Sequence, residues 1–90
     1  MEQFISTEGG YYVNMRYVQW ITIVEYEDGR CNIVAGYDDQ NVEDVDDVII
    51  GFSTGERWLA DRVLAKIMNF IGRGIGFIDP YLLVEVVKHE

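Results

Sequence analysis

The chain has 90 residues, of which 49% are hydrophobic and 13% aromatic, so it is long and apolar enough to fold as one globular domain over residues 1–90 rather than remain disordered. Its 16 acidic residues against 7 basic ones give a net charge of −9, which argues against direct nucleic-acid binding, because phosphate contacts need clustered Lys and Arg. Cys31 is the single cysteine, which excludes an internal disulfide, and there is neither an apolar run of about 18 residues nor a signal-peptide pattern. We therefore expect a cytoplasmic protein without membrane association.

The first part of the chain is typical of β-sheet. Residues 3–7 and 11–13 are β-prone and flank the turn Glu8-Gly9-Gly10, which predicts a hairpin. Residues 14–16 interrupt this pattern and predict a short helical turn or an irregular link. The strongest strand signal is YVQWITIVEY at 17–26, and an Asp-Gly turn at 28–29 leads from it into a returning strand at 31–37.

The long strand at 17–26 shows only weak alternation of polar and apolar residues. Trp20 and Tyr26 lie on one face and Ile21 and Ile23 on the other, so neither face is cleanly polar. A sheet with one solvated face alternates clearly. Either this strand is covered on both sides, or its second face meets another chain. As the candidate dimer face we take Tyr17, Trp20, Ile21, Ile23 and Tyr26.

An acidic stretch, DDQNVEDVDD, occupies residues 38–47 and predicts a loop. It lacks the glycine that a helix–loop–helix calcium site requires, so a metal site is not expected. The stretch is either a solvated loop or a surface for a basic partner. The candidate partner-binding residues are Asp38, Asp39, Glu43, Asp44, Asp46 and Asp47.

A long amphipathic helix is predicted over residues 53–73, after a short strand at 48–52. Ser53 and Glu56 have the spacing of a capping box, a broad apolar stripe follows, and Gly72 and Gly74 are stop signals. Strands followed by a helix favour the α+β class, with an antiparallel sheet of about four to five strands and this helix packed on one face.

The segment after Gly76 contains two opposing signals. Asp79 as cap with Pro80 in the first turn favours a helix, whereas the β-branched Val84, Val86 and Val87 favour a strand. We expect a short helix.

Residues with catalytic chemistry are few. His89 is the single histidine and lies next to the last residue, where chains fray, and Cys31 has no adjacent base or C-x-x-C partner. The glycines at 72, 74 and 76 follow a helix instead of leading from a strand into one, so they do not fit a phosphate loop. No catalytic, cofactor-binding or metal-binding residue is nominated, and we expect that the protein is not an enzyme.

The segments FISTEGGYYVNMRYVQWITI and IIGFSTGERWLADRVLAKIMNFI, with an Asp-Gly hairpin between them, resemble a loosely defined group of short bacterial and phage proteins. The resemblance spans about residues 4–71 and implies a small β-sheet followed by an amphipathic helix. The acidic stretch 38–47 and the tail after Gly76 depart from the group's pattern.

Two functions outside enzymology follow from these features. The leading hypothesis is a non-enzymatic protein-interaction module that forms a homodimer through the second sheet face or an edge strand. The alternative is an acidic inhibitor, phage-type or regulatory, that binds a basic nucleic-acid-binding protein by imitating the phosphate backbone.

Overall fold

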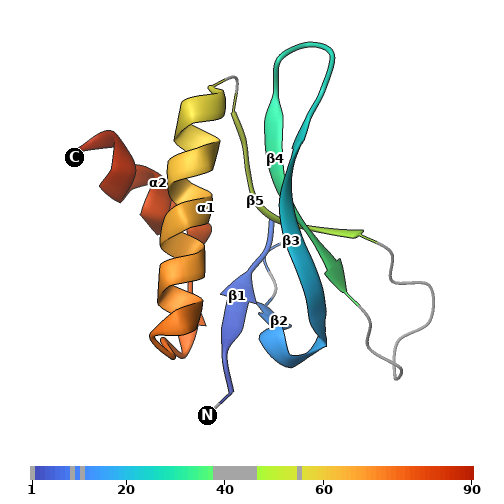
Figure 1. Cartoon of the computed structure of the whole chain (residues 1–90), viewed down its shortest axis with the longest axis vertical. Helices are drawn as coiled ribbons and strands as arrows, with labels where there is room; N and C mark the ends of the chain where they lie inside the picture. The colour runs from blue at the N-terminus through green and yellow to red at the C-terminus, as the bar shows by residue number, and fades with distance from the viewer. Residues whose placement is uncertain (1, 9, 11, 38–46, 55) are drawn as a thin grey trace.

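The computed structural model describes residues 2–8, 10, 12–37, 47–54 and 56–90, with the backbone alone described at 37 and 47–54. Along the chain (Figure 1) the elements are β1 (Phe4–Ser6), β2 (Tyr12–Asn14), the short 3-10 helix η1 (Met15–Tyr17), β3 (Val18–Glu25), β4 (Cys31–Tyr37), β5 (Asp47–Thr54), α1 (Arg57–Gly72), β6 (Phe77–Ile78) and α2 (Pro80–Lys88). The predicted α+β class is confirmed.

The larger sheet is antiparallel, with strand order β3-β4-β5. The predicted hairpin between β3 and β4 is confirmed, and its turn is held by Asp28, whose carboxylate accepts from the Arg30 backbone N–H at 3.0 Å. The central strand β4 is buried at every position from Cys31 to Gly36, whereas β3 contains no fully buried residue. β4 is therefore the buried central strand of this sheet, and β3 is an edge strand.

A second sheet makes the expectation of a single sheet wrong. In the described residues it has the order β2-β1-β6, with β2 antiparallel and β6 parallel to β1. Gly74, at φ 73°, turns the chain back after α1, and the Phe4 N–H then donates to the Gly76 carbonyl at 2.8 Å. The predicted hairpin of β1 and β2 is confirmed, but β6 was not expected as a strand.

Helix α1 begins at Arg57 instead of Ser53, so the predicted capping box does not form. The backbone of Ser53 belongs to β5, where it lies opposite Asn32 of β4. Glu56 is the cap residue, and its carboxylate accepts from the Trp58 indole N–H at 2.6 Å without making a capping bond. Pairing with β4 therefore extends the strand through the residues that local signals assign to the helix. The end of the helix at Gly72 agrees with the predicted stop.

The predicted C-terminal helix is confirmed as α2. The Asp79 carboxylate accepts from the Tyr81 backbone N–H at 3.0 Å, and Pro80 occupies the first turn. The same oxygen accepts from the Ser6 hydroxyl at 3.2 Å, which ties the start of α2 to β1.

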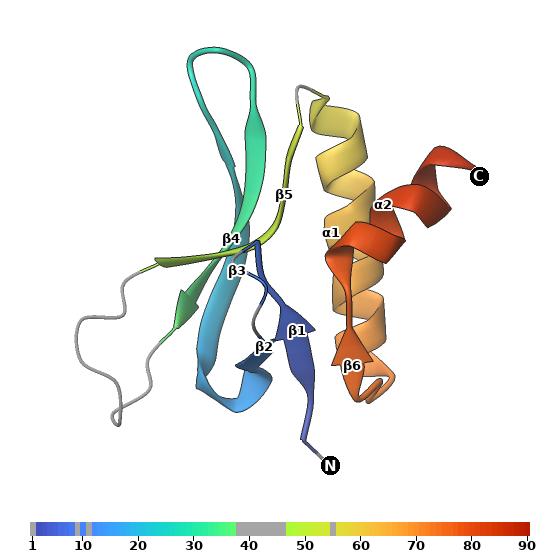
Figure 2. The same ribbon diagram turned by 180° about the vertical axis from the view of Figure 1, so that it is seen from behind.

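Both helices lie on one side of the larger sheet, as Figures 1 and 2 show, so the expectation of one long helix as the sole cover is wrong. α2 packs against both α1 and β5. The two sheets and two helices share one core, which contains Ile5, Val13, Ile33, Ala35, Leu59, Val63, Ile67, Ile78, Leu83, Val84 and Val87. Within the described part of the chain, no helix has the length and apolar character that a membrane crossing needs.

The Asp79 cap gives a direct test of the fold. We expect Asp79→Ala to lower the free energy of unfolding by about 1 kcal/mol, because the Tyr81 N–H and the Ser6 hydroxyl lose their acceptor. Asp79→Asn keeps a capping oxygen and should stay close to wild type. Urea unfolding followed by far-UV circular dichroism measures both, and equal stability of the two variants would contradict the capping role.

Candidate interaction surface

The five residues of the predicted dimer face do not share one surface. Ile21 and Ile23 point to the helix side, where they are half-buried against the core, so their assignment to an outer face is corrected. Tyr17 belongs to η1 and not to β3, and the Arg16 guanidinium lies over its ring at 5.9 Å. Only Trp20 and Tyr26 remain on the side of the sheet away from the helices.

Trp20 and Tyr26 are partly covered by their own chain. The Asn32 side-chain amide donates to the Tyr26 hydroxyl at 3.3 Å, and the Trp20 indole lies so close to Gly36 that a Cβ there would overlap it. Trp20 is 43% exposed and Tyr26 39% exposed. These two aromatic residues therefore lie across β4, and they leave less open apolar surface on this face than the sequence predicts.

The outer edge of β3 has no partner strand within the described part of the chain. The Tyr26 N–H donates to the Arg30 carbonyl at 2.8 Å, so Tyr26 and Arg30 are a hydrogen-bonded pair of the hairpin. This pair determines which residues further along β3 bond to β4. Because antiparallel pairs alternate between bonded and non-bonded positions, Thr22 and Val24 direct their backbone groups to β4. The N–H and C=O groups of Ile21, Ile23 and Glu25 therefore point away from the sheet.

The two edges of the larger sheet differ in cover. Besides β4, β5 contacts α1, α2 and β1, whereas the main additional contact of β3 is with α1. Proteins protect edge strands with lysine, proline, short length or a bulge. β3 has eight residues without lysine or proline, and its bulge falls between Val18 and Trp20, which leaves the segment WITIV without such protection.

The carboxylate at the end of this edge, Glu25, shares one cation with Asp61. Glu25 accepts from Arg57 at 3.3 Å, and Arg57 also donates to Asp61 at 3.2 Å. The hydrogen bond and charge of Asp61, together with the charge of Glu25, raise the pKa of Arg57 above its ordinary value. Arg57 therefore partly offsets the charge of Glu25, and the three groups together carry one negative charge.

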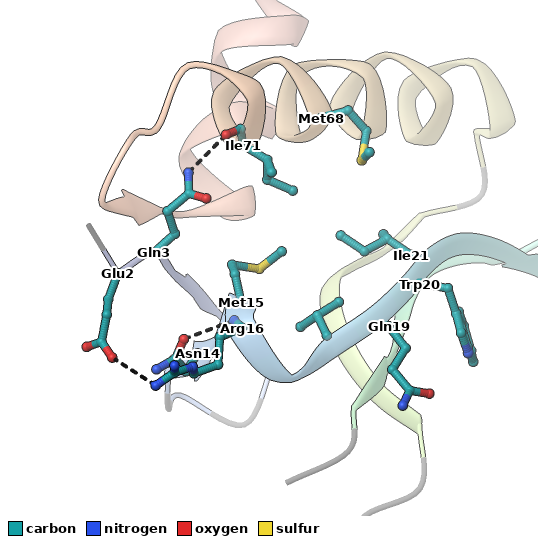
Figure 3. A pocket seen from close by; sticks show the side chains of 11 residues that line it. Glu2, Gln3, Asn14, Met15, Arg16, Gln19, Trp20, Ile21, Met68 and Ile71 are labelled. Carbon is teal, nitrogen blue, oxygen red and sulfur yellow. Dashed lines mark hydrogen bonds and ion pairs between the residues drawn. The ribbon is translucent and has the colours of Figure 1, made fainter.

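A groove of about 640 Å³ lies between the second half of α1 and the start of β3. Figure 3 shows Met68 and Ile71 facing Met15 and Ile21 across it, while Gln19 and Trp20 point to the other side of the strand. The Gln3 side-chain amide closes one end by donating to the carbonyls of Ile71 and Ile75, both at 3.1 Å. The groove thus has an apolar floor directly beside the open edge of β3.

The rim of the groove carries one ion pair. Arg16 lies 3.9 Å from Glu2, and the Arg16 side chain is 66% exposed. A charge pair this long and exposed contributes little to stability. Arg16 is therefore available to a second carboxylate.

The groove was not predicted from the sequence. Its walls come from residues 2–3, 14–21 and 68–71, and no local pattern joins these segments. Met68 belongs to the apolar stripe of α1 but is 52% exposed, and this exposure follows from the tertiary arrangement and not from the helical pattern.

The acidic candidates cannot be placed together. Asp38, Asp39, Glu43, Asp44 and Asp46 lie outside the described residues. The backbone of Asp47 opens β5 opposite Gly36. Their role as a partner surface stays a prediction.

Other reactive groups are dispersed. Cys31 is fully buried, and its Sγ lies 3.8 Å from the Gly29 carbonyl, while His89 is exposed and lies 3.9 Å from Glu85. Among the residues that the structure describes, no three His, Cys, Asp or Glu side chains gather as metal ligands would.

An aromatic cluster on the smaller sheet is a second exposed apolar surface. The Phe77 ring stacks on Phe4 at 5.7 Å and meets Tyr12 edge-on at 5.8 Å, and Phe77 is 69% exposed. Phe77 therefore packs against both of the other rings. The strands that carry Tyr12 and Phe77, β2 and β6, have three and two residues, so their edges are much shorter than that of β3.

Comparison of the chain with known protein families, curated proteins and solved structures finds no match. The function is therefore inferred from the geometry of β3 and the groove.

The contact between Trp20 and Gly36 can be tested by substitution. We expect Gly36→Ala to push the indole off β4 and lower the free energy of unfolding by about 1–2 kcal/mol. Tryptophan fluorescence in a Trp58→Phe background should shift to the red as Trp20 becomes more exposed. In a Trp20→Ala background the same substitution should cost much less, and an undiminished cost in this double-mutant cycle would contradict the contact.

Proposed function

We propose that this protein is a small non-enzymatic interaction module that acts by strand addition at the free edge of β3, with a second copy of the chain as its partner. The carrying observation is that Ile21, Ile23 and Glu25 direct their backbone groups away from β4. A strand that pairs with these groups continues the sheet and satisfies them.

A second copy fits this edge because an antiparallel strand pair is compatible with two-fold symmetry. In such an interface the same patch of both copies is used. The unprotected segment WITIV consists of β-branched and aromatic residues, which favour cross-strand pairing. The edge is preferred over the open face because Trp20 and Tyr26 already lie across β4.

The overall charge of −9 opposes association of two copies, whereas the edge segment WITIV contains no charged residue. Added salt screens long-range repulsion between the copies and leaves backbone pairing intact. The dimer is therefore expected to tighten, not dissociate, as the salt concentration rises.

Ile23→Pro tests the proposal. The Ile23 N–H points away from β4, so proline at this position removes no bond within the chain, while its ring blocks an incoming strand. Light scattering coupled to size-exclusion chromatography should give twice the 10.4 kDa chain mass for wild type and the single chain mass for Ile23→Pro.

The matched control is Ile23→Val, which keeps the N–H and should remain dimeric. Circular dichroism must show that Ile23→Pro is folded. A wild-type protein that stays monomeric up to millimolar concentration would overturn the proposal, as would a folded Ile23→Pro variant that is still a dimer.

A further inference from the structure

We infer that the two copies pair about a two-fold axis at Thr22 and that the groove of each copy receives the hairpin end of the other copy's β3. The inference rests on the proposed self-association and adds its register, its side-chain contacts and a charge pair. Three observations carry it: the hydrogen-bonding phase of β3, the place of the groove beside the edge, and the exposed Arg16 at the rim.

The positions of β3 whose backbone groups point outward limit the registers in which two copies can pair. An outward residue forms backbone hydrogen bonds only when an outward residue of the partner lies opposite it, so the odd-numbered positions of the two strands must face one another. The bulge after Val18 confines regular pairing to residues 20–25, so the axis passes through Thr22 or Ile23.

Side-chain pairing decides between these two registers. With the axis at Thr22, Ile21 stands opposite the partner's Ile23, and Trp20 stands opposite the partner's Val24. With the axis at Ile23, Ile21 stands opposite the partner's Glu25, which sets a carboxylate against an apolar neighbour. The Thr22 register pairs apolar residues on both sides of the axis, where Thr22 meets the partner's Thr22, and it places Glu25 opposite the partner's Gln19, outside the regular pairing.

This register fills the groove. Opposite residues of an antiparallel pair project to the same side of the sheet, so the partner's Ile23 projects to the helix side beside Ile21. Ile21 and Met68 both line the groove at that point. The side chain of the partner's Ile23 therefore enters the apolar floor under Met68, and the flexible thioether adapts to it.

The same register brings opposite charges together at the rim. Beyond Glu25, the turn of the partner's hairpin points towards η1, which brings the partner's Glu27 to the end of the groove where Arg16 lies. Asp28 is held by Arg30 at 2.7 Å, which leaves Glu27 as the carboxylate nearest the rim. Each dimer then contains two identical contacts between Arg16 of one copy and Glu27 of the other.

A charge exchange tests the arrangement. Arg16→Glu and Glu27→Arg should each raise the dimer dissociation constant about tenfold, because two opposite-charge contacts become like-charge contacts. An equimolar mixture of the two variants restores opposite signs at both contacts. Sedimentation velocity with one variant fluorescently labelled should therefore show a heterodimer of near wild-type affinity.

The direction in which Glu27→Arg changes the dimer affinity distinguishes a specific contact from an effect of overall charge. Glu27→Arg moves the net charge two units towards zero from −9, so overall repulsion alone predicts a tighter dimer. Glu8→Arg makes the same charge change in the turn between β1 and β2 and serves as the matched control. We expect Glu8→Arg to leave dimerisation unchanged or stronger and Glu27→Arg to weaken it.

The outcomes distinguish this inference from the proposed function. A wild-type dimer that Ile23→Pro dissociates, but in which the charge variants neither weaken nor rescue each other, would overturn the register and leave edge pairing in place; the groove would then have another occupant. A monomeric wild type would overturn both. Mutual rescue by the mixed variants supports the Thr22 register.

Discussion

The antiparallel register of β3 with β4 is the constraint on which the rest of the structure depends. It is set at the Asp28-Gly29 turn and holds from Glu25 back to Trp20. A slip of one residue would send Ile21 and Ile23 away from the core and turn Trp20 towards α1. The same register decides which backbone groups of β3 face β4 and which face solvent, so the core and the candidate interface have one common origin.

The parts of the fold that could be predicted are those with local causes. The β3–β4 hairpin follows from its turn residues, and α2 follows from Asp79 and Pro80 in spite of its valines. The start of α1 could not be predicted, because pairing of Ser53 with β4 overrides a local capping signal. The parallel pairing of β6 with β1 joins the two ends of the chain, and no periodicity within either segment indicates it.

The prominence of β3 in the candidate site was also predictable, since its weak alternation indicates a surface that water alone does not explain. The assignment of its residues to a single face was not, because Ile21 and Ile23 serve the core while Trp20 and Tyr26 cover β4. The openness of an edge depends on what stands beside it, and that is a property of the tertiary arrangement. For the same reason, sequence patterns do not predict the groove.

The pairing of β1 with β6 has a consequence for the order in which the molecule assembles. The Gln3 side chain bonds to Ile71, 68 positions further along, and β1 completes its sheet only with Phe77 and Ile78. During synthesis, Ile5 and Val13 must wait for β6 and α2 to leave the ribosome before their side of the core closes. Such distant contacts form slowly, so the early, partly closed chain exposes both these residues and the margin of β3. The period of greatest risk of misassociation therefore lasts until β6 and α2 have been made.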